Sequence, residues 1–233
     1  MTAVAGQVAE SGDDTGLGVT VEGGACWFTA IPAGDFTDPT PSQLEGLAAG
    51  LGLAGRTFSR STQVHGTDVR VVPSPAEAVP GEEHDGQVTT SREVICAVRT
   101  ADCLPVALFS PSAAGVIHAG WRGLAAGVLA EGVGAMERAG GGPVSAVIGP
   151  GAHACCYEAG DEVHRAFAGL GGQARSGTSA DLPWVAGEQL RRLGVGVVAQ
   201  VGGCTICTPG PLWHSHRRDG PNAGRSLALA WRS

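Results

Sequence analysis

GVIHAGWRG, at residues 115–123, places a histidine, a tryptophan and an arginine within five positions, where an apolar run meets a helical pattern. The composition of GVIHA predicts a short buried strand. The segment that follows, residues 124–140, predicts an amphipathic helix with Leu124, Val128 and Met136 near one face. At such a junction His118 is either a packed core residue or part of a site.

The elements on both sides of this stretch follow no regular strand–helix alternation. Strand patterns dominate the first half of the chain, at residues 17–21, 25–30, 67–72, 87–90, 94–100 and 104–110. Helices are predicted at 42–53, 158–170 and 182–194, and later strands at 144–149, 195–201 and 226–232. This order favours an α+β protein, or a layered sandwich with mixed sheets, over a Rossmann domain.

Length and composition indicate one domain. A chain of 233 residues with 43% hydrophobic residues can bury a sizeable core, and no internal repeat or linker divides it. Residues 1–16 are polar and Gly-rich, so we expect a variable tail or an extra sheet edge there, and a single catalytic domain over residues 17–233.

The charge of the chain bears on its partners. The formal net charge is -7, which disfavours general binding to nucleic acid or to an anionic membrane. The N-terminal residues lack a basic segment followed by an apolar run, and no apolar run approaches the length of a membrane span. We therefore expect a cytoplasmic protein.

The seven cysteines indicate reduced thiols, because an odd number in a chain of this length makes a complete disulfide framework a poor interpretation. Cys204 and Cys207 form a C-x-x-C motif, but no second such motif accompanies it, so a zinc ribbon or a redox function has little support. We interpret the adjacent Cys155 and Cys156 as structural.

Three residues that could carry chemistry stand at strand ends or turns: His65 in STQVHG, Cys103 in TADCLP, and His118. Two imidazoles and one thiolate would make a three-ligand zinc site with a fourth position open to water or substrate. The same residues could instead form a nucleophilic cysteine with a histidine base. The spacing of the three residues leaves both interpretations open, and each residue alone is more often a packed one.

Charged neighbours extend this candidate site. Asp102 could orient a ligating histidine, or it could serve a different contact, because adjacent strand residues point to opposite faces. Arg122, just before the predicted helix, could bind an anion. Arg217 and Arg218 in HSHRRDG (214–220) suit bidentate contacts to a phosphate, a carboxylate or a nucleobase.

Taken together and in this order, the motifs STQVHGTDV, TADCLPVAL, VIHAGWRGLAAGV, IGPGAHACCYEAGDEV and SHRRDG resemble those of the YfiH family, also called the laccase-domain or DUF152 family. The resemblance runs from about Trp27 to Trp231. It implies an α/β/β/α layered sandwich with mixed sheets. It also implies that His65, Cys103 and His118 bind the metal, with Asp102 and Gln63 in supporting positions.

The activity that the resemblance implies has been described in several ways. One description is a copper polyphenol oxidase, or laccase. Another is a zinc-dependent purine nucleoside phosphorylase for adenosine, inosine, guanosine and methylthioadenosine, with adenosine deaminase activity; editing of a peptidoglycan precursor is a third. A metal site with an open position favours the nucleoside chemistry, and Arg122, Arg217 and Arg218 are candidates for binding phosphate or ribosyl groups.

One position departs from the family pattern. Family members often carry an aromatic residue where His216 precedes the arginine pair, so His216 would stack on a purine in its place, or the substrate preference would differ.

Overall fold

The computed structural model describes residues 8–209 and 212–233, so the predicted N-terminal tail lies outside the described residues over positions 1–7. Residues 9–13 of that segment form an edge strand, β1. It belongs to a six-stranded sheet in the order β1 (Ala9–Asp13), β2 (Gly16–Val21), β3 (Gly24–Thr29), β14 (Ser226–Arg232), β7 (Val94–Thr100) and β4 (Thr57–Ser59). The neighbours pair antiparallel except for β4 and β7, which are parallel.

A second six-stranded sheet is also mixed. Its order is β13 (Gly196–Gln200), β10 (Ser145–Ile148), β8 (Leu104–Phe109), β9 (Ala114–Ala119), β6 (Gly86–Thr89) and β5 (Val69–Val71). The outer pairs β10–β13 and β5–β6 are parallel, and the inner pairs are antiparallel. The strand GVIHA predicted from the sequence is β9, in the middle of this sheet.

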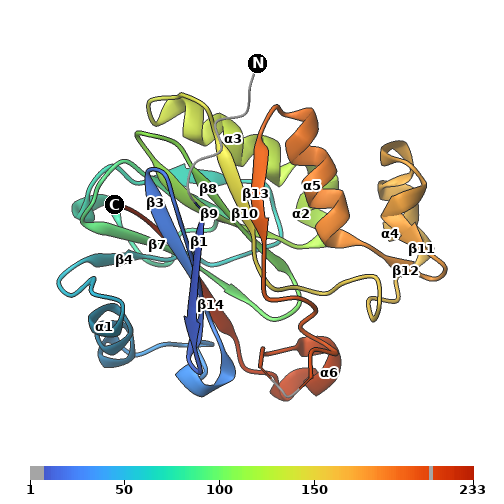
Figure 1. Ribbon diagram of the computed structural model, residues 1–233, viewed down its shortest axis with the longest axis horizontal. Coiled ribbons are helices and arrows are strands. Elements are labelled where there is room, and N and C mark those ends of the chain that lie inside the picture. The colour runs from blue at the N-terminus through green and yellow to red at the C-terminus, as the bar shows by residue number, and fades with distance from the viewer. Residues whose placement is uncertain (1–7, 210–211) are drawn as a thin grey trace.

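Helices cover the outer faces of the two sheets, which pack against each other through residues such as Phe28, Phe109 and Val116. On one side α1 (Pro41–Gly50) packs through Leu44 onto the first sheet. On the other side lie α2 (Trp121–Ala126), α3 (Val128–Arg138) and α5 (Leu182–Arg192). Figure 1 shows α1 and the α3–α5 pair on opposite sides of the sheets, which confirms the predicted α/β/β/α sandwich of a single domain.

Local sequence explains where two helices begin and end. Thr40 and Gln43 form a capping box at the start of α1, in which the Gln43 N–H donates to Thr40 Oγ1 at 3.3 Å. The single helix predicted over residues 124–140 is wrong, because Gly127 has a φ of 99° and divides it into α2 and α3. A left-handed glycine is the usual C-cap of a helix, and here it also starts the next one.

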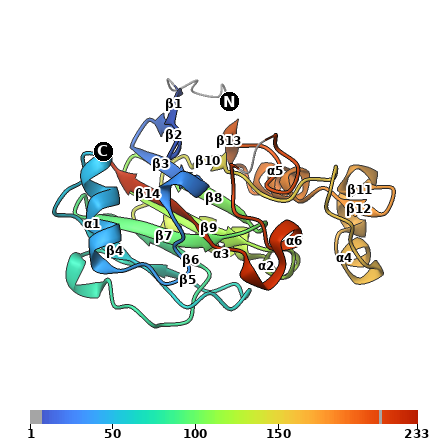
Figure 2. The same cartoon turned by 90° about the horizontal axis from the view of Figure 1, so that it is seen from below.

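The remaining elements lie at the periphery. The helix predicted over residues 158–170 is shorter than expected, α4 (Asp161–Ala166), followed by two single turns. With the two-stranded β11 (Arg175–Ser176) and β12 (Ser179–Ala180), α4 projects from one side of the sandwich in both ribbon views (Figures 1 and 2). The short α6 (His216–Asp219) carries the arginine pair. Among the described residues, no helix is both long enough and apolar enough to cross a membrane.

Candidate active site

The register of β8 and β9 brings two of the three predicted site residues together. Leu104 pairs with Ala119, so Cys103, one residue before β8, lies beside Gly120, one residue after β9. A Cβ atom added at Gly120 would lie only 3.0 Å from Cys103 Sγ and 3.0 Å from His65 Cδ2. Glycine at position 120 therefore lets the three side chains approach one another.

His65 comes to this point on the loop between β4 and β5, with a φ of 60°. A left-handed histidine is uncommon and is kept only where its surroundings fix it. Here the buried Asp85 carboxylate accepts the backbone N–H groups of Val64 at 3.2 Å, His65 at 3.0 Å and Gly66 at 2.7 Å. Asp85 thus holds the loop that presents His65.

The same carboxylate orients His118. Asp85 Oδ1 lies 2.7 Å from His118 Nδ1, and the His118 N–H donates to the Asp85 carbonyl at 2.7 Å. When Nδ1–H is bonded to a carboxylate, the lone pair of Nε2 is free to bind a metal ion. This arrangement is typical of metal-ligating histidines. Asp85 therefore links the two histidines of the site.

The donor atoms of His65, Cys103 and His118, called below the His–Cys–His cluster, all lie within 4.8 Å of one another. Cys103 Sγ is 3.8 Å from His65 Nε2, and the two imidazole rings meet edge to face with centroids 4.9 Å apart. Two nitrogens and one sulfur at this spacing, with Nε2 of His118 directed by Asp85, fit a zinc ion with an open fourth position. Two histidines and one cysteine also occur as copper ligands.

The ionisation of the cluster follows from its contacts. Burial raises the Cys103 pKa, but hydrogen bonding to His118 and His65 outweighs it and lowers the pKa to about 6. Burial lowers the pKa of His118, whereas the bonds to Asp85 and then Cys103 raise it to about 9. Without a metal, the pair is thus a thiolate and an imidazolium at neutral pH.

Asp102 serves a contact away from the histidines. Its φ is 89°, its Oδ1 accepts the Thr205 hydroxyl at 2.6 Å, and its Oδ2 accepts the backbone N–H of Arg217 at 2.6 Å. Asp85, and not Asp102, is therefore the carboxylate that orients a histidine of the cluster. Asp102 instead ties the Cys103 turn to the two C-terminal loops.

The guanidinium groups of the three predicted arginines differ in how many of their hydrogen bonds are made within the protein. Arg218 is fully engaged: it binds the Asp219 carboxylate and donates to the carbonyls of Thr205 and Trp213, each at 2.9 Å. The Arg217 guanidinium lies 5.0 Å from the Tyr157 ring centroid and, among the described residues, donates one hydrogen bond, to the Glu158 carbonyl at 3.1 Å.

Arg122 is exposed and stacks on Trp121, with 4.5 Å from its guanidinium carbon to the ring centroid. Within the part of the chain that the structure describes, no hydrogen bond occupies its guanidinium. Arg122 and Arg217 thus keep donors available for an anion, whereas Arg218 holds protein segments together.

Gln63 lies on the loop that carries His65, and His216 lies on the helix that carries the arginine pair. The Gln63 amide exchanges two 2.8 Å hydrogen bonds with the backbone of Arg99, which fastens the His65 loop to the end of β7. His216 is the first residue of α6, whose N-cap Ser215 accepts the Arg218 N–H at 3.1 Å.

Sequence reasoning missed two residues of this region. Asp85 lies in the loop at 73–86, where no motif drew attention, and its only sequence signal is its position directly before a buried strand. Tyr157 is the only tyrosine of the chain. Burial and then the Cys103 charge raise the pKa of its phenol, whereas Arg217 and Arg122 oppose them, and the Arg217 guanidinium lies over its ring.

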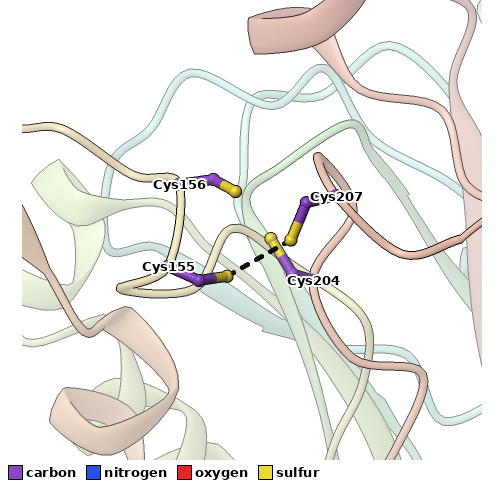
Figure 3. Close-up of side chains that lie close together, drawn as sticks. All are labelled: Cys155, Cys156, Cys204 and Cys207. Atoms are coloured by element: carbon purple, nitrogen blue, oxygen red, sulfur yellow. Dashed lines mark hydrogen bonds between the residues drawn. The ribbon is translucent and has the colours of Figure 1, made fainter.

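The structure also brings together residues that the sequence analysis had set aside. Cys155, Cys156, Cys204 and Cys207, called below the four-cysteine cluster, place their sulfur atoms within 4.8 Å of one another (Figure 3). All four are free thiols.

Comparisons with known proteins agree with this architecture. Residues 31–233 match the family described as multi-copper polyphenol oxidoreductase laccase. A Mycobacterium bovis protein named purine nucleoside phosphorylase is 34% identical over 218 residues, which span 88% of this chain and 85% of that protein.

Two solved structures resemble the whole fold. A Neisseria meningitidis DUF152 protein superposes with a TM-score of 0.76 at 27% identity, covering 97% of this chain and 99% of that one. YlmD from Geobacillus stearothermophilus has a TM-score of 0.79 at 25% identity, with the same coverage of 97% and 99%. The motifs, the layered fold and these matches together show that the chain belongs to the laccase-domain (DUF152) family, some of whose members are named purine nucleoside phosphorylases.

Proposed function

We propose that this protein is a zinc-dependent purine nucleoside phosphorylase acting on adenosine, inosine, guanosine and methylthioadenosine, with adenosine deaminase activity. The observation that carries the proposal is the His–Cys–His cluster, whose three donor atoms lie within 4.8 Å of one another and whose two histidines are held by one buried carboxylate, Asp85. The relatives named purine nucleoside phosphorylase support the choice of substrate class.

In phosphorolysis a phosphate oxygen forms a bond to C1′ of the ribose while the C1′–N bond to the purine breaks. The purine leaves with the bonding electron pair and takes up a proton, and the sugar is released as ribose 1-phosphate. Arg122 and Arg217, which keep guanidinium donors available, would bind the phosphate. Tyr157, whose ring contacts the Arg217 guanidinium, would line the substrate pocket.

His65, Cys103 and His118 would hold the metal, and Asp85 would fix the orientation of His118. A zinc ion bound there would supply Lewis acidity and a bound water of lowered pKa. Deamination of adenosine replaces the exocyclic amino group by oxygen from water and releases ammonia, so it needs no phosphate.

The decisive test is the phosphate-dependent release of hypoxanthine from inosine by purified, zinc-loaded protein. We expect equal amounts of hypoxanthine and ribose 1-phosphate, no release without phosphate, and loss of the activity in the Cys103→Ala variant. Ammonia release from adenosine in the absence of phosphate measures the deaminase activity separately. Absence of base release by the zinc-loaded protein, or unchanged release by Cys103→Ala, would refute the phosphorylase proposal.

Phenol oxidation is the competing activity, because the family description names it and two histidines with one cysteine can hold copper. Oxidation of a phenol by oxygen requires a redox-active metal, which zinc is not. Oxygen uptake with a phenol, measured on copper-loaded and zinc-loaded protein side by side, distinguishes the two activities.

A further inference from the structure

The four-cysteine cluster is assembled from two loops far apart in sequence. Cys155 and Cys156 lie on the turn after β10, and Cys204 and Cys207 on the turn after β13. Figure 3 shows the four side chains entering from these two loops with their sulfur atoms turned toward a common centre. Cys155 Sγ and Cys207 Sγ are 3.4 Å apart.

Backbone hydrogen bonds hold the two loops together. Gly151 pairs with Cys204 as a parallel bridge, in which the Thr205 N–H donates to the Gly151 carbonyl at 2.9 Å. On the first loop, the N–H groups of Cys156 and Tyr157 both donate to the His153 carbonyl, at 3.0 and 2.9 Å. This tight turn is what lets two adjacent cysteines point to the same centre.

The spacing of the sulfur atoms matches metal coordination. Four thiolates bound at about 2.3 Å to one tetrahedral zinc ion stand about 3.8 Å apart. The observed sulfur atoms all lie within 4.8 Å of one another, and Cys155 Sγ and Cys207 Sγ are 3.4 Å apart. Shifts of about 1 Å or less would bring the four sulfur atoms to tetrahedral spacing around an ion.

We propose that Cys155, Cys156, Cys204 and Cys207 form a second metal site, a tetrathiolate that binds a soft divalent cation of the zinc class. The site is closed, because four protein sulfurs fill a tetrahedral shell and leave no position for substrate. Its role is therefore structural. Binding exchanges thiol protons for the cation, so affinity rises with pH.

A disulfide explains less of the geometry. A disulfide joins two sulfurs at about 2.05 Å, so bonding Cys155 to Cys207 would leave Cys156 and Cys204 without a purpose at the same centre. A disulfide uses only two sulfur atoms, whereas a tetrahedral ion uses four, which is the number that the two loops bring together.

The proposed ion would also stabilise the active site. Tyr157 follows directly after Cys156, and its ring meets Arg217. Thr205 follows Cys204, and its hydroxyl binds Asp102, next to Cys103. Each of the two loops thus carries a residue next to a cluster cysteine that contacts Arg217 or Asp102, and Asp102 is adjacent to the ligand Cys103.

Metal counting on the reduced full-length protein tests the proposal without using activity. After loading with Zn²⁺ and desalting without chelator, we expect two zinc ions per wild-type chain and one in the Cys204→Ser/Cys207→Ser variant. His118→Ala should also retain one ion, at the four-cysteine cluster. Cys26→Ala, which removes a buried thiol from the core between the sheets, is the matched control and should retain two.

Cobalt substitution identifies the ligands directly on the wild-type protein. Sulfur-to-cobalt charge-transfer absorption grows with the number of thiolates, so the four-cysteine cluster should contribute about four times the absorption of a site with one thiolate. If the double variant does not fold, the single Cys155→Ser variant at an exposed position should show reduced absorption and faster loss of zinc to a chelator.

One zinc ion per wild-type chain together with none in His118→Ala would overturn the proposal. A cobalt spectrum with only one thiolate ligand would do the same. A Cys155–Cys207 disulfide found by peptide mapping in protein loaded with Zn²⁺ would assign the cluster to redox chemistry instead. None of these three results depends on whether the protein cleaves nucleosides.

Discussion

The two clusters of this protein fix their donor atoms in different ways. The His–Cys–His cluster relies on the buried Asp85 carboxylate, which binds His118 and three consecutive N–H groups around His65. The four-cysteine cluster relies on backbone hydrogen bonds, namely the turn closed at the His153 carbonyl and the bridge between Gly151 and Cys204.

This difference separates two kinds of site. Two histidines and one cysteine leave one position of a tetrahedral ion free, as chemistry on a substrate requires. Four sulfurs fill the shell and can only hold loops together. The first cluster is therefore the one where substitutions should affect catalysis most, and the second is where they should affect loop order.

The largest expected effect is at Cys103. Cys103→Ala removes the only sulfur of the His–Cys–His cluster, and we expect kcat/KM for phosphorolysis to fall more than about 1000-fold, because charge stabilisation by a metal is worth several kcal/mol. Steady-state assays with zinc-loaded protein measure it. Retention of one zinc ion by the inactive variant would show that the four-cysteine cluster binds metal independently of catalysis. Near-normal activity would contradict a catalytic role for the His–Cys–His cluster.

A smaller loss is expected at Asp85. Asp85→Asn keeps the shape of the side chain but removes the charge that orients His118, and substitutions of this type cost about 10- to 100-fold in metal affinity or activity. Zinc competition with a chromogenic chelator should show one weakened site and one unchanged site. Equal weakening of both would mean that the clusters are not independent.

Arg217 lies between the two clusters. Arg217→Ala should raise KM for phosphate about tenfold or more, since a charge-assisted hydrogen bond contributes about 1.5–3 kcal/mol. Arg218→Ala is the matched comparison: its guanidinium is occupied by Asp219, Thr205 and Trp213, so thermal stability should fall more than phosphate affinity. Phosphate titrations and melting curves of both variants test this division, and the reverse pattern would contradict it.

The smallest effect concerns pH. In chelator-treated protein the Cys103 thiolate is present above its pKa of about 6 and is lost as the pH falls through that value. Alkylation at Cys103 should therefore slow about twofold between pH 7 and pH 6. Hydrogen bonding to Cys207 and then burial raise the Cys156 pKa to about 11, so Cys156 should react slowly over this whole range. Mass spectrometry of the alkylated peptides, with equal rates at both residues as the contrary result, measures the contrast.

Much of the fold could be predicted because helices and strands that bury one face keep a regular spacing of apolar residues. The strand that contains His118 and the helical pattern after it were predicted from residues 115–140, and only Gly127 divided the helix there. The sequence does not show which glycine within an apolar helical pattern adopts a positive φ, so the division into α2 and α3 could be seen only in the structure. The α/β/β/α layering came from the family resemblance.

The site was predictable where a motif carried the residue and not where only topology did. His65, Cys103 and His118 stand in recognisable motifs, and the structure brings them together. Asp85 and the four-cysteine cluster depend on contacts across 20 or more residues, from Asp85 to His65 and from Cys155 to Cys207. No local pattern encodes such a contact, because C-x-x-C and an adjacent cysteine pair each occur often without a partner.

His65 and Asp102 have a bearing on engineering. They are the two non-glycine residues with positive φ among the described residues, and each stands at or next to the His–Cys–His cluster. At position 65 a selection for heat resistance alone would favour glycine, because glycine adopts such an angle without steric cost. At position 102 glycine would also lose the hydrogen bonds of the carboxylate to Thr205 and Arg217. Thermal tolerance and turnover would therefore be traded against each other at His65, where the strained residue is a donor of the cluster.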